Sequence, residues 1–287
     1  MQKKKKCTTQ FLSVPALLLF SIFFVYPLLR GVGMSLTDWD GMGEAHFVGL
    51  RNFIQFFEDK RAINDIKTTL VFAIGSAMLL NLVGLGYALL MNTKFKGKSI
   101  SRMIIYLPAI ISPLIMGYIW YFLLQPGRGY LVYALEQLGV PDFLGNWMSS
   151  YGSAMAVLIL VNVWQFSGMT MIIYLAGLQS IPTELLEAAR MDGATTWQLF
   201  HRVTLPLLLP AIRINVVTNI IGSLSVFDII MSLTEGGPGY ATESLSIYIM
   251  RMCYGSRTGY STAVALILFL IILIPVLISL RLTREKE

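Results

Sequence analysis

The chain has few charged residues for its length. Asp, Glu, Lys and Arg make up 13% of its 287 residues, whereas apolar residues make up 55%. A soluble protein needs about 25% charged residues to cover its surface. The scarcity of charge therefore excludes ordinary water-soluble domains and predicts an all-α polytopic membrane protein. The net charge of +6 then bears on orientation in the bilayer, and we expect no nucleic-acid partner.

Cysteine and histidine are almost absent. The two cysteines, Cys7 and Cys253, provide neither a disulfide framework nor a set of metal ligands. The two histidines, His46 and His201, are expected on opposite sides of the membrane, so they cannot join one catalytic cluster. We therefore expect no metal site, no catalytic residues and no enzymatic activity in this chain.

A complete phosphate-binding loop is also missing. Gly97-Lys98-Ser99 matches the end of the pattern G-x-x-x-x-G-K-[ST], but Asn92 stands where the first glycine is required. No strand is expected before it. The chain is therefore not expected to bind a cofactor or to hydrolyse ATP itself.

Long apolar runs are what the sequence has in abundance. A helix needs about 20 apolar residues to cross a bilayer. Runs near residues 11–29, 69–91, 103–124, 153–178, 207–233 and 262–280 meet this requirement. The first run is too long, and too poor in small residues at its end, for a removable signal peptide. We predict six transmembrane helices, the third kinked at Pro108 and Pro113.

Basic residues gather in alternate connections. They are the lysines at positions 3–6 before the first span, Lys94, Lys96, Lys98 and Arg102 after the second, and Arg281, Arg284 and Lys286 after the last. Because basic connections stay in the cytoplasm, both termini and the connection at residues 179–206 are predicted to be cytoplasmic. The first long connection, residues 31–67, is then external. It contains an expected short amphipathic helix, and Trp39, Phe53, Phe56 and Phe57 suit the membrane interface.

The connection at residues 179–206 is the most polar interruption of the second half. Asp192-Gly193 should end a first helix, because Gly adopts the left-handed conformation readily. Thr195 and Gln198 have the spacing of a capping box that starts a second helix, which Pro206 should end.

One face of that first helix is acidic. Glu184, Glu187, Ala188 and Met191 share it. The local pattern alone fits two interpretations, a surface helix whose charges are solvated and a face on which another protein docks.

This block resembles the EAA loop of ABC importer permeases. The family pattern is Glu-Ala-Ala, three residues, Gly, nine residues, Ile, one residue and Leu-Pro. Here Glu187, Ala188, Ala189, Gly193, Leu205 and Pro206 stand at those positions, with Val203 in place of Ile. The resemblance implies the type I importer permease fold, with this loop as the coupling helix in a cleft of the ATPase subunit. The implied coupling residues are Glu184, Glu187, Ala188, Ala189, Asp192, Gly193 and Ala194.

Polar side chains line one face of the fourth predicted span and one face of the fifth. They include Asn162 and Gln165 on the fourth, and Asn215, Asn219 and Ser223 on the fifth. Amides are costly in lipid, so these faces should look toward other helices or a wet cavity. Interhelical hydrogen bonds and a polar pathway both account for them. A pathway of amides with an aromatic wall suits a sugar.

A second motif resembles the carbohydrate branch of the family, the maltose, glycerol-phosphate and multiple-sugar type permeases. Residues 233–238 match its Leu-Thr-x-Gly-Gly-Pro signature, and residues 36–39 and 49–53 match its first-partner type. The resemblance implies that Gly236, Gly237 and Pro238 face a solute-binding protein. It also implies a substrate pathway made by Gln165, Phe166, Met169, Asn219, Gly222, Ser223 and Val226.

The resemblance further implies the assembly. The chain would be a single permease domain, residues 1–287, in a prokaryotic cytoplasmic (inner) membrane. Its partners would be a second homologous permease, two ATPase subunits that hold ATP and Mg²⁺, and an extracytoplasmic solute-binding protein. Together they would import a sugar, or a related polyol or glycerol-phosphate compound, by alternating access.

A secondary transporter or channel that works without an ATPase is the alternative from another class. It requires several buried acids or histidines, or ligands for a coupled ion, within the spans. Asp228 is the one acid well inside a predicted span. A membrane-bound enzyme is a more distant alternative.

Overall fold

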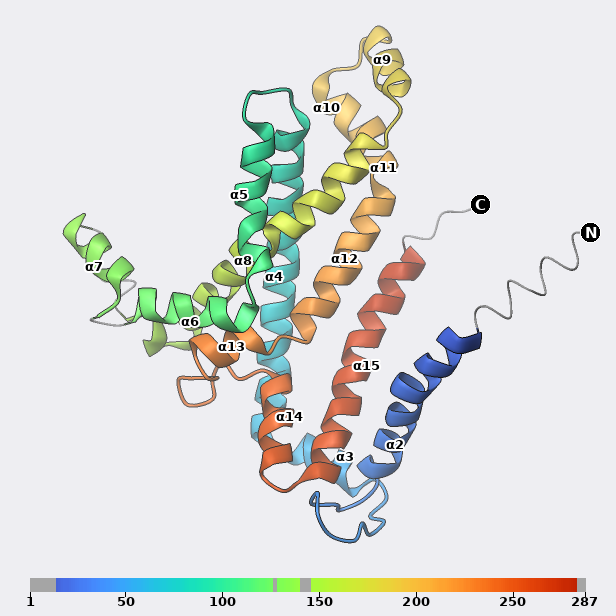
Figure 1. Cartoon of the computed structure of the whole chain (residues 1–287), viewed down its shortest axis with the longest axis vertical. Coiled ribbons are helices and arrows are strands. Elements are labelled where there is room, and N and C mark those ends of the chain that lie inside the picture. The colour runs from blue at the N-terminus through green and yellow to red at the C-terminus, as the bar shows by residue number, and fades with distance from the viewer. Residues whose placement is uncertain (1–13, 126–127, 140–145, 283–287) are drawn as a thin grey trace, which may run out of the picture. The chain divides into compact units, whose positions relative to one another are not determined.

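The computed structural model describes residues 14–125, 128–139 and 146–282 (Figure 1). Within these residues the secondary structure is helical, apart from an isolated bridge between Thr37 and Phe47, so the predicted all-α class is confirmed. The lysines at positions 3–6, Cys7, Arg284 and Lys286 lie outside the described residues. The chain divides into two compact units, Met1–Ala62 with Tyr248–Phe269, and Ile63–Ile247 with Leu270–Glu287.

The smaller unit is built around the first long connection. A helix from Val14 continues through a π-helical turn, Ser21–Val25, into α2 (Tyr26–Ser35), and α3 (Arg51–Glu58) follows. Asn52 is buried and its amide donates to the carbonyls of Ser35 and Thr37, which pairs groups left free where α2 ends. The unit also contains most of α14 (Leu245–Tyr254) and the first half of α15 (Thr258–Leu282).

The larger unit contains α5 (Lys98–Ile110), α8 (Tyr151–Gln179), α12 (Leu209–Leu224) and most of α4 (Lys60–Asn92). Both α5 and α12 pack against α8. Gly84 lets α4 approach α8, because a Cβ there would lie 2.5 Å from a methyl group of Thr170. Close packing of α4 against α8 therefore occurs at Gly84.

An apolar cluster joins three of these helices at one end of the larger unit. It is formed by Ala88, Met91, Met171, Tyr174, Leu175, Leu178, Ile181, Leu208 and Ala211. Gly177 allows the close contact of α8 with α12, because a Cβ there would lie 2.6 Å from the Cβ of Ala211.

Six candidate spans occur among the described residues if two bent helix pairs each count as one. Four helices are long and apolar enough alone, Val14–Ser35, Lys60–Asn92, Tyr151–Gln179 and Thr258–Arg281. The pair α5 and α6 (Pro113–Leu124) bends by 96°, and the pair Thr196–Leu207 and α12 bends by 67°.

The third and fifth predicted spans need correction. The third is broken after Ile110 instead of kinked, because Pro113 has no N–H to donate and starts a new helix, while Pro108 stays inside α5. The fifth ends at Leu224 instead of residue 233. Asp228 begins a separate short helix, α13 (Asp228–Leu233), where an acid complements the positive end of the helix dipole. α6 packs against α13.

The remaining elements are short. They are α7 (Tyr130–Gln137), the 3₁₀ turn η2 (Trp147–Ser149), α9 (Thr183–Met191), α10 (Thr196–Leu199), the π-helical η3 (Phe200–Thr204) and α11 (Leu205–Leu207). The helical segment Thr196–Leu207 ends one residue after Pro206, and the chain bends by 67° at Leu208. The predicted end of the second helix at Pro206 is therefore confirmed to within one residue.

Candidate functional site

Helix α9 has one anchored face and one free face. Ile181, just before it, is buried in the apolar cluster, and Leu186 packs against the same cluster. On the opposite face Glu184, Glu187, Ala188 and Met191 are all exposed, Met191 by 88%. The helix is thus fixed from one side and presents an acidic face with a flexible methionine on the other.

The end of α9 is set by a glycine in the left-handed conformation. Gly193 has φ 80°. Its N–H donates to the carbonyl of Arg190, and the N–H of Ala194 donates to that of Ala189, which is the Schellman pattern. A Cβ on Gly193 would meet no atom within 4 Å, so the backbone angle, not space, requires glycine.

The capping box follows immediately. The N–H of Gln198 donates to Oγ1 of Thr195, and the N–H of Thr195 donates to Oε1 of Gln198 at 2.9 Å. The two short helices predicted here are confirmed. Trp197 is 70% exposed and its ring lies 3.9 Å from that of His201.

Within the larger unit, α9 and α10 lie at the same end as the α4–α5 connection (Figure 1). That connection carries Lys94 and Lys96. The basic connection and the acidic face of α9 therefore occupy one end of the unit, as expected for two segments on the same side of a membrane.

A polar cavity of about 260 Å³ lies between α8 and α12. Its amide and hydroxyl side chains come from both helices, and Phe166, Met169 and Ile173 add apolar walls. Its polar lining residues are Asn162, Thr170, Asn215, Thr218, Asn219 and Ser223. None of the residues that line it carries a formal charge, so the cavity can offer hydrogen bonds and ring contacts to a neutral polar molecule.

Five of the seven residues expected in the substrate pathway line this cavity: Phe166, Met169, Asn219, Gly222 and Ser223. Thr170 and Thr218 also line it but were not singled out from the sequence, because a lone Thr in a span is commonly bonded to its own helix. Thr218 indeed donates to the carbonyl of Ile214, one turn back.

Some of the cavity amides also bond between the two helices. Asn215 is fully buried and donates to the carbonyl of Thr170 at 3.2 Å, whereas Asn219 and the Thr170 hydroxyl lie 3.4 Å apart, a weak contact. Asn215 therefore has a clear interhelical role, and the amide of Asn219 is only loosely held.

Gln165 and Val226 do not line the cavity, which corrects their expected orientation. Gln165 is fully buried and its amide donates to the carbonyl of Ile111 at 3.0 Å. That carbonyl lies at the α5–α6 break, where it accepts from Gln165 in place of a helical N–H donor. Val226 is buried beyond the end of α12, and its carbonyl accepts from Ser244.

The turn after α13 is held rigidly to α4. Thr68 donates to the carbonyl of Ala241, and the N–H of Leu245 donates to the hydroxyl of Thr69 at 2.9 Å. Gly236 is buried and Gly237 half-buried, so of the three expected contact residues only Pro238 is freely exposed. Gly239 and Tyr240 complete the exposed tip, Tyr240 by 47%.

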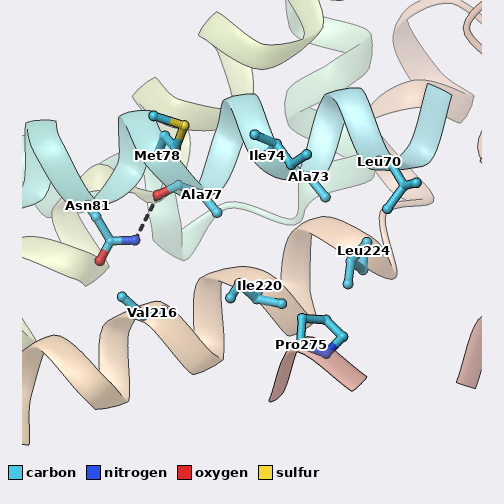
Figure 2. A pocket seen from close by; sticks show the side chains of 10 residues that line it. All are labelled: Leu70, Ala73, Ile74, Ala77, Met78, Asn81, Val216, Ile220, Leu224 and Pro275. Carbon is cyan, nitrogen blue, oxygen red and sulfur yellow. Dashed lines mark hydrogen bonds between the residues drawn. The ribbon is translucent and has the colours of Figure 1, made fainter. Parts of the chain in front are cut away.

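A larger cavity of about 500 Å³ lies between α4 and α12 and has a different character. Figure 2 shows the side chains of Val216, Ile220 and Leu224 on α12 facing those of α4, with Pro275 beside them. Asn81 is its one amide, and it is already paired with the carbonyl of Ala77 and the hydroxyl of Tyr174. This cavity suits hydrocarbon, not a polar solute.

Comparison with protein families gives one match over most of the chain. The family described as "Binding-protein-dependent transport system inner membrane component" matches residues 80–285. These residues include the polar cavity, the α9 region and the turn after α13.

Individual relatives match along nearly their whole length. The probable starch degradation products transport system permease protein AmyD of Thermoanaerobacterium thermosulfurigenes is 34% identical over 95% of this chain and 92% of its own. The multiple sugar-binding transport system permease protein MsmF of Streptococcus mutans is 34% identical over 96% and 95%. The sn-glycerol-3-phosphate transport system permease protein UgpA of Yersinia pestis is 33% identical over 96% and 93%.

Two solved structures have the same fold. A chain of a bacterial ABC transporter involved in the import of the acidic polysaccharide alginate superimposes with a TM-score of 0.83 at 26% identity, over 99% of this chain and 97% of that one. A chain of the alginate transporter in complex with an alginate pentasaccharide-bound periplasmic protein gives the same TM-score and identity, over 98% and 95%.

Proposed function

We propose a function for this chain from one premise: it belongs to the family of binding-protein-dependent transport system inner membrane components. It is a multi-pass membrane permease, not an enzyme. Its function is to form part of the membrane pathway of an ABC importer that takes up a sugar or a related compound. Relatives named for starch degradation products, multiple sugars and glycerol phosphate support this substrate class.

The observation that carries the proposal is the free acidic face of α9. Glu184 and Glu187 stand on a helix whose other face is fixed to the apolar cluster through Ile181 and Leu186. We infer that residues 179–206 are the coupling segment and that α9 docks on an ATPase subunit. Ala188 permits close approach, and Met191 adapts its shape to a partner surface.

The polar cavity between α8 and α12 is our candidate for this chain's part of the sugar path. Amides and hydroxyls pair with sugar hydroxyls, and the ring of Phe166 can lie against the C–H face of a sugar. Transport then follows from alternating access, in which ATP-driven movement of α9 changes the packing of α8 and α12.

The importer we envisage lies in a prokaryotic cytoplasmic membrane and has further subunits. A second permease would complete the pathway, and two ATPase subunits would hold ATP and Mg²⁺, so this chain needs no cofactor. A solute-binding protein would deliver sugar on the outer side and contact Pro238 and its neighbours in the exposed tip of the turn after α13. The solved complex of the alginate transporter with its periplasmic protein supports such a partner.

Replacement of Glu187 by lysine tests the coupling role. A basic partner for Glu187 in the ATPase cleft would be partly desolvated, and loss of one member of such a pair costs about 2–5 kcal/mol. We expect tagged Glu187→Lys to insert normally but to lose co-purification of the ATPase. Uptake of radiolabelled maltose or trehalose, whichever the wild type transports, should fall with it.

Glu44→Lys is the matched control, because Glu44 is an exposed glutamate in the first long connection. It should leave ATPase co-purification and uptake unchanged. Normal ATPase binding and normal uptake by the Glu187→Lys variant would refute the coupling role of α9. Failure of the wild-type chain to co-purify with any ATPase would refute the importer function itself.

A further inference from the structure

The smaller unit contains a polar cavity of about 290 Å³ that the transport function does not use. Arg51 and Gln55 line it from α3, one helical turn apart, and Arg257 lines it from the chain just before α15. Trp39 and Tyr260 contribute aromatic walls.

The cavity is built from fixed parts. The guanidinium of Arg257 lies over the ring of Tyr260, 4.1 Å from its centroid. The N–H of Gly259 donates to the carbonyl of Trp39 at 2.8 Å, and any side chain on Gly259 would collide with the carbonyl of Thr37. The approach of the two chain segments that form the walls therefore requires glycine at position 259.

The cavity has a surplus of positive charge. Its one acid, Asp38, accepts a hydrogen bond from the N–H of His46 at 2.9 Å and lies 3.6 Å from that imidazole. Within the part of the chain that the structure describes, neither Arg51 nor Arg257 forms an ion pair with a carboxylate. Two guanidinium groups and one carboxylate thus line the cavity, which leaves one positive charge in excess. Asp59, which does not line the cavity, also attracts Arg257.

Helix α3 has three different faces. Asn52 and Phe56 are buried against the unit, and Arg51 and Gln55 face the cavity. The third face is apolar and exposed, formed by Leu50, Ile54 and Phe57, which are 64%, 59% and 65% accessible. A helix of this kind lies at a membrane surface with its apolar face among the acyl chains.

The cavity also has the right depth in the membrane. Asp38 follows the candidate span Val14–Ser35 by three residues, and Arg257 directly precedes the candidate span that begins at Thr258. Both walls therefore lie at the ends of candidate spans, in the part of each span that belongs to the smaller unit. This is the level at which the phosphates of phospholipid headgroups lie.

We propose that this cavity binds the phosphate of a phospholipid headgroup, through Arg51 and Arg257 with Gln55 as a further donor. Guanidinium groups match phosphate oxygens in geometry and charge. The acyl chains of the bound lipid would run beside Leu50, Ile54 and Phe57. A carboxylate of the solute-binding protein could also satisfy the two arginines, but it would leave this apolar face in water.

Native mass spectrometry of the full-length chain with added phosphatidylglycerol tests the phosphate contact. A basic residue near a lipid surface contributes about 1 kcal/mol, so the double variant Arg51→Gln/Arg257→Gln should bind the lipid about 30-fold more weakly. Arg128→Gln, a change of an exposed arginine in the other unit, should bind as the wild type does. A phosphate-free diglucosyl lipid should bind the wild type weakly, with an affinity no higher than that of the double variant for phosphatidylglycerol.

Unchanged phosphatidylglycerol binding by the double variant would overturn the proposal. So would equal binding of the phosphate-free lipid. Displacement of the lipid by inorganic phosphate at low millimolar concentration would assign the cavity to free phosphate instead. If the double variant keeps its lipid but loses capture of the solute-binding protein, the cavity belongs to that protein.

A spin label tests the depth of α3 independently. In a background without cysteine, a label at Phe57→Cys should be accessible to oxygen and protected from a water-soluble nickel complex in phosphatidylglycerol bilayers. A label at Glu58→Cys, an exposed polar neighbour, should give the opposite result. A label at position 57 that is as open to the nickel complex as one at position 58 would contradict the membrane contact.

Discussion

Gln165 and Asn219 are amides of the same unit with different surroundings. Gln165 is fully buried and pairs with the carbonyl of Ile111, whereas Asn219 lines the polar cavity and makes one weak contact. An amide that satisfies a backbone carbonyl left free at a helix break chiefly affects stability, and an amide that faces a cavity chiefly affects what the cavity binds.

We therefore expect Gln165→Ala to lower stability and Asn219→Ala to lower uptake. Leaving the carbonyl of Ile111 without its donor should cost about 1–3 kcal/mol, measurable as a lower thermal midpoint in detergent. Asn219→Ala should keep a wild-type midpoint and ATPase co-purification while sugar uptake falls. A destabilised Asn219→Ala variant would instead indicate that Asn219 serves to hold α8 and α12 together.

Gly193 permits a second experiment at the residue scale. Its φ of 80° costs a residue with a Cβ roughly 1–2 kcal/mol, but Asn tolerates the left-handed region better than Val. Gly193→Val should therefore disturb the end of α9 and weaken ATPase co-purification. Gly193→Asn should be close to wild type, because a side chain meets no atom there. Equal loss in both variants would point to a direct contact of Gly193 with the ATPase.

The sequence predicted cavity-facing residues well where helical periodicity decides the face. Phe166 and Met169, and likewise Asn219 and Ser223, follow that periodicity on α8 and α12. Gln165 was misplaced because its partner is 54 residues away, at a break in another helix. Pro113 indicated that backbone carbonyls near it would lack a helical N–H donor. Nothing in the local sequence indicated that the side chain of Gln165 would supply one.

At the scale of elements, a partly buried carboxylate contact joins α14 to the start of α4 within the smaller unit. The hydroxyl of Tyr248 on α14 donates to Asp59, which precedes α4, at 2.6 Å. Burial raises the pKa of Asp59, but hydrogen bonds from Tyr248 and from the N–H groups of Arg61 and Ala62 outweigh it and leave the pKa below its ordinary value. Burial raises the pKa of Tyr248, so its hydroxyl remains a donor.

This contact predicts a pH-dependent effect of Tyr248→Phe. Because the pKa of Asp59 is depressed on folding, its stabilisation is present above the unfolded pKa of about 3.9 and is lost as pH falls through the folded value. Tyr248→Phe should lower the thermal midpoint at pH 7, and this difference should shrink as the pH falls below about 4. A difference independent of pH would mean that the hydroxyl acts through Tyr260 alone.

Hydropathy predicts where a span lies but not where it bends or ends. Hydropathy finds apolar runs of sufficient length, and each run that it found overlaps one candidate span. It carries no information on direction. Pro113 predicted a kink but not a full break of 96°, and the end of α12 at Leu224 was missed. In both places the run stays apolar while the chain turns.

At the scale of the whole molecule, orientation in the membrane is open to direct measurement. We expect Lys96→Cys and Tyr240→Cys, each in a cysteine-free background, to react with an impermeant maleimide from opposite sides. Tyr240 is preferable to Gly237 because the latter is partly covered. Reaction of both cysteines from outside intact cells would contradict the six-span orientation.

The apolar cluster beneath α9 has a mechanical consequence. Ile181, which leads into α9, shares it with Ala88 of α4, Tyr174 of α8 and Ala211 of α12. Packed apolar side chains are nearly incompressible, so a push on α9 cannot be absorbed locally. The cluster then acts as a rigid joint. A displacement of the short helix α9 is transmitted through it to the long helices α4, α8 and α12 together.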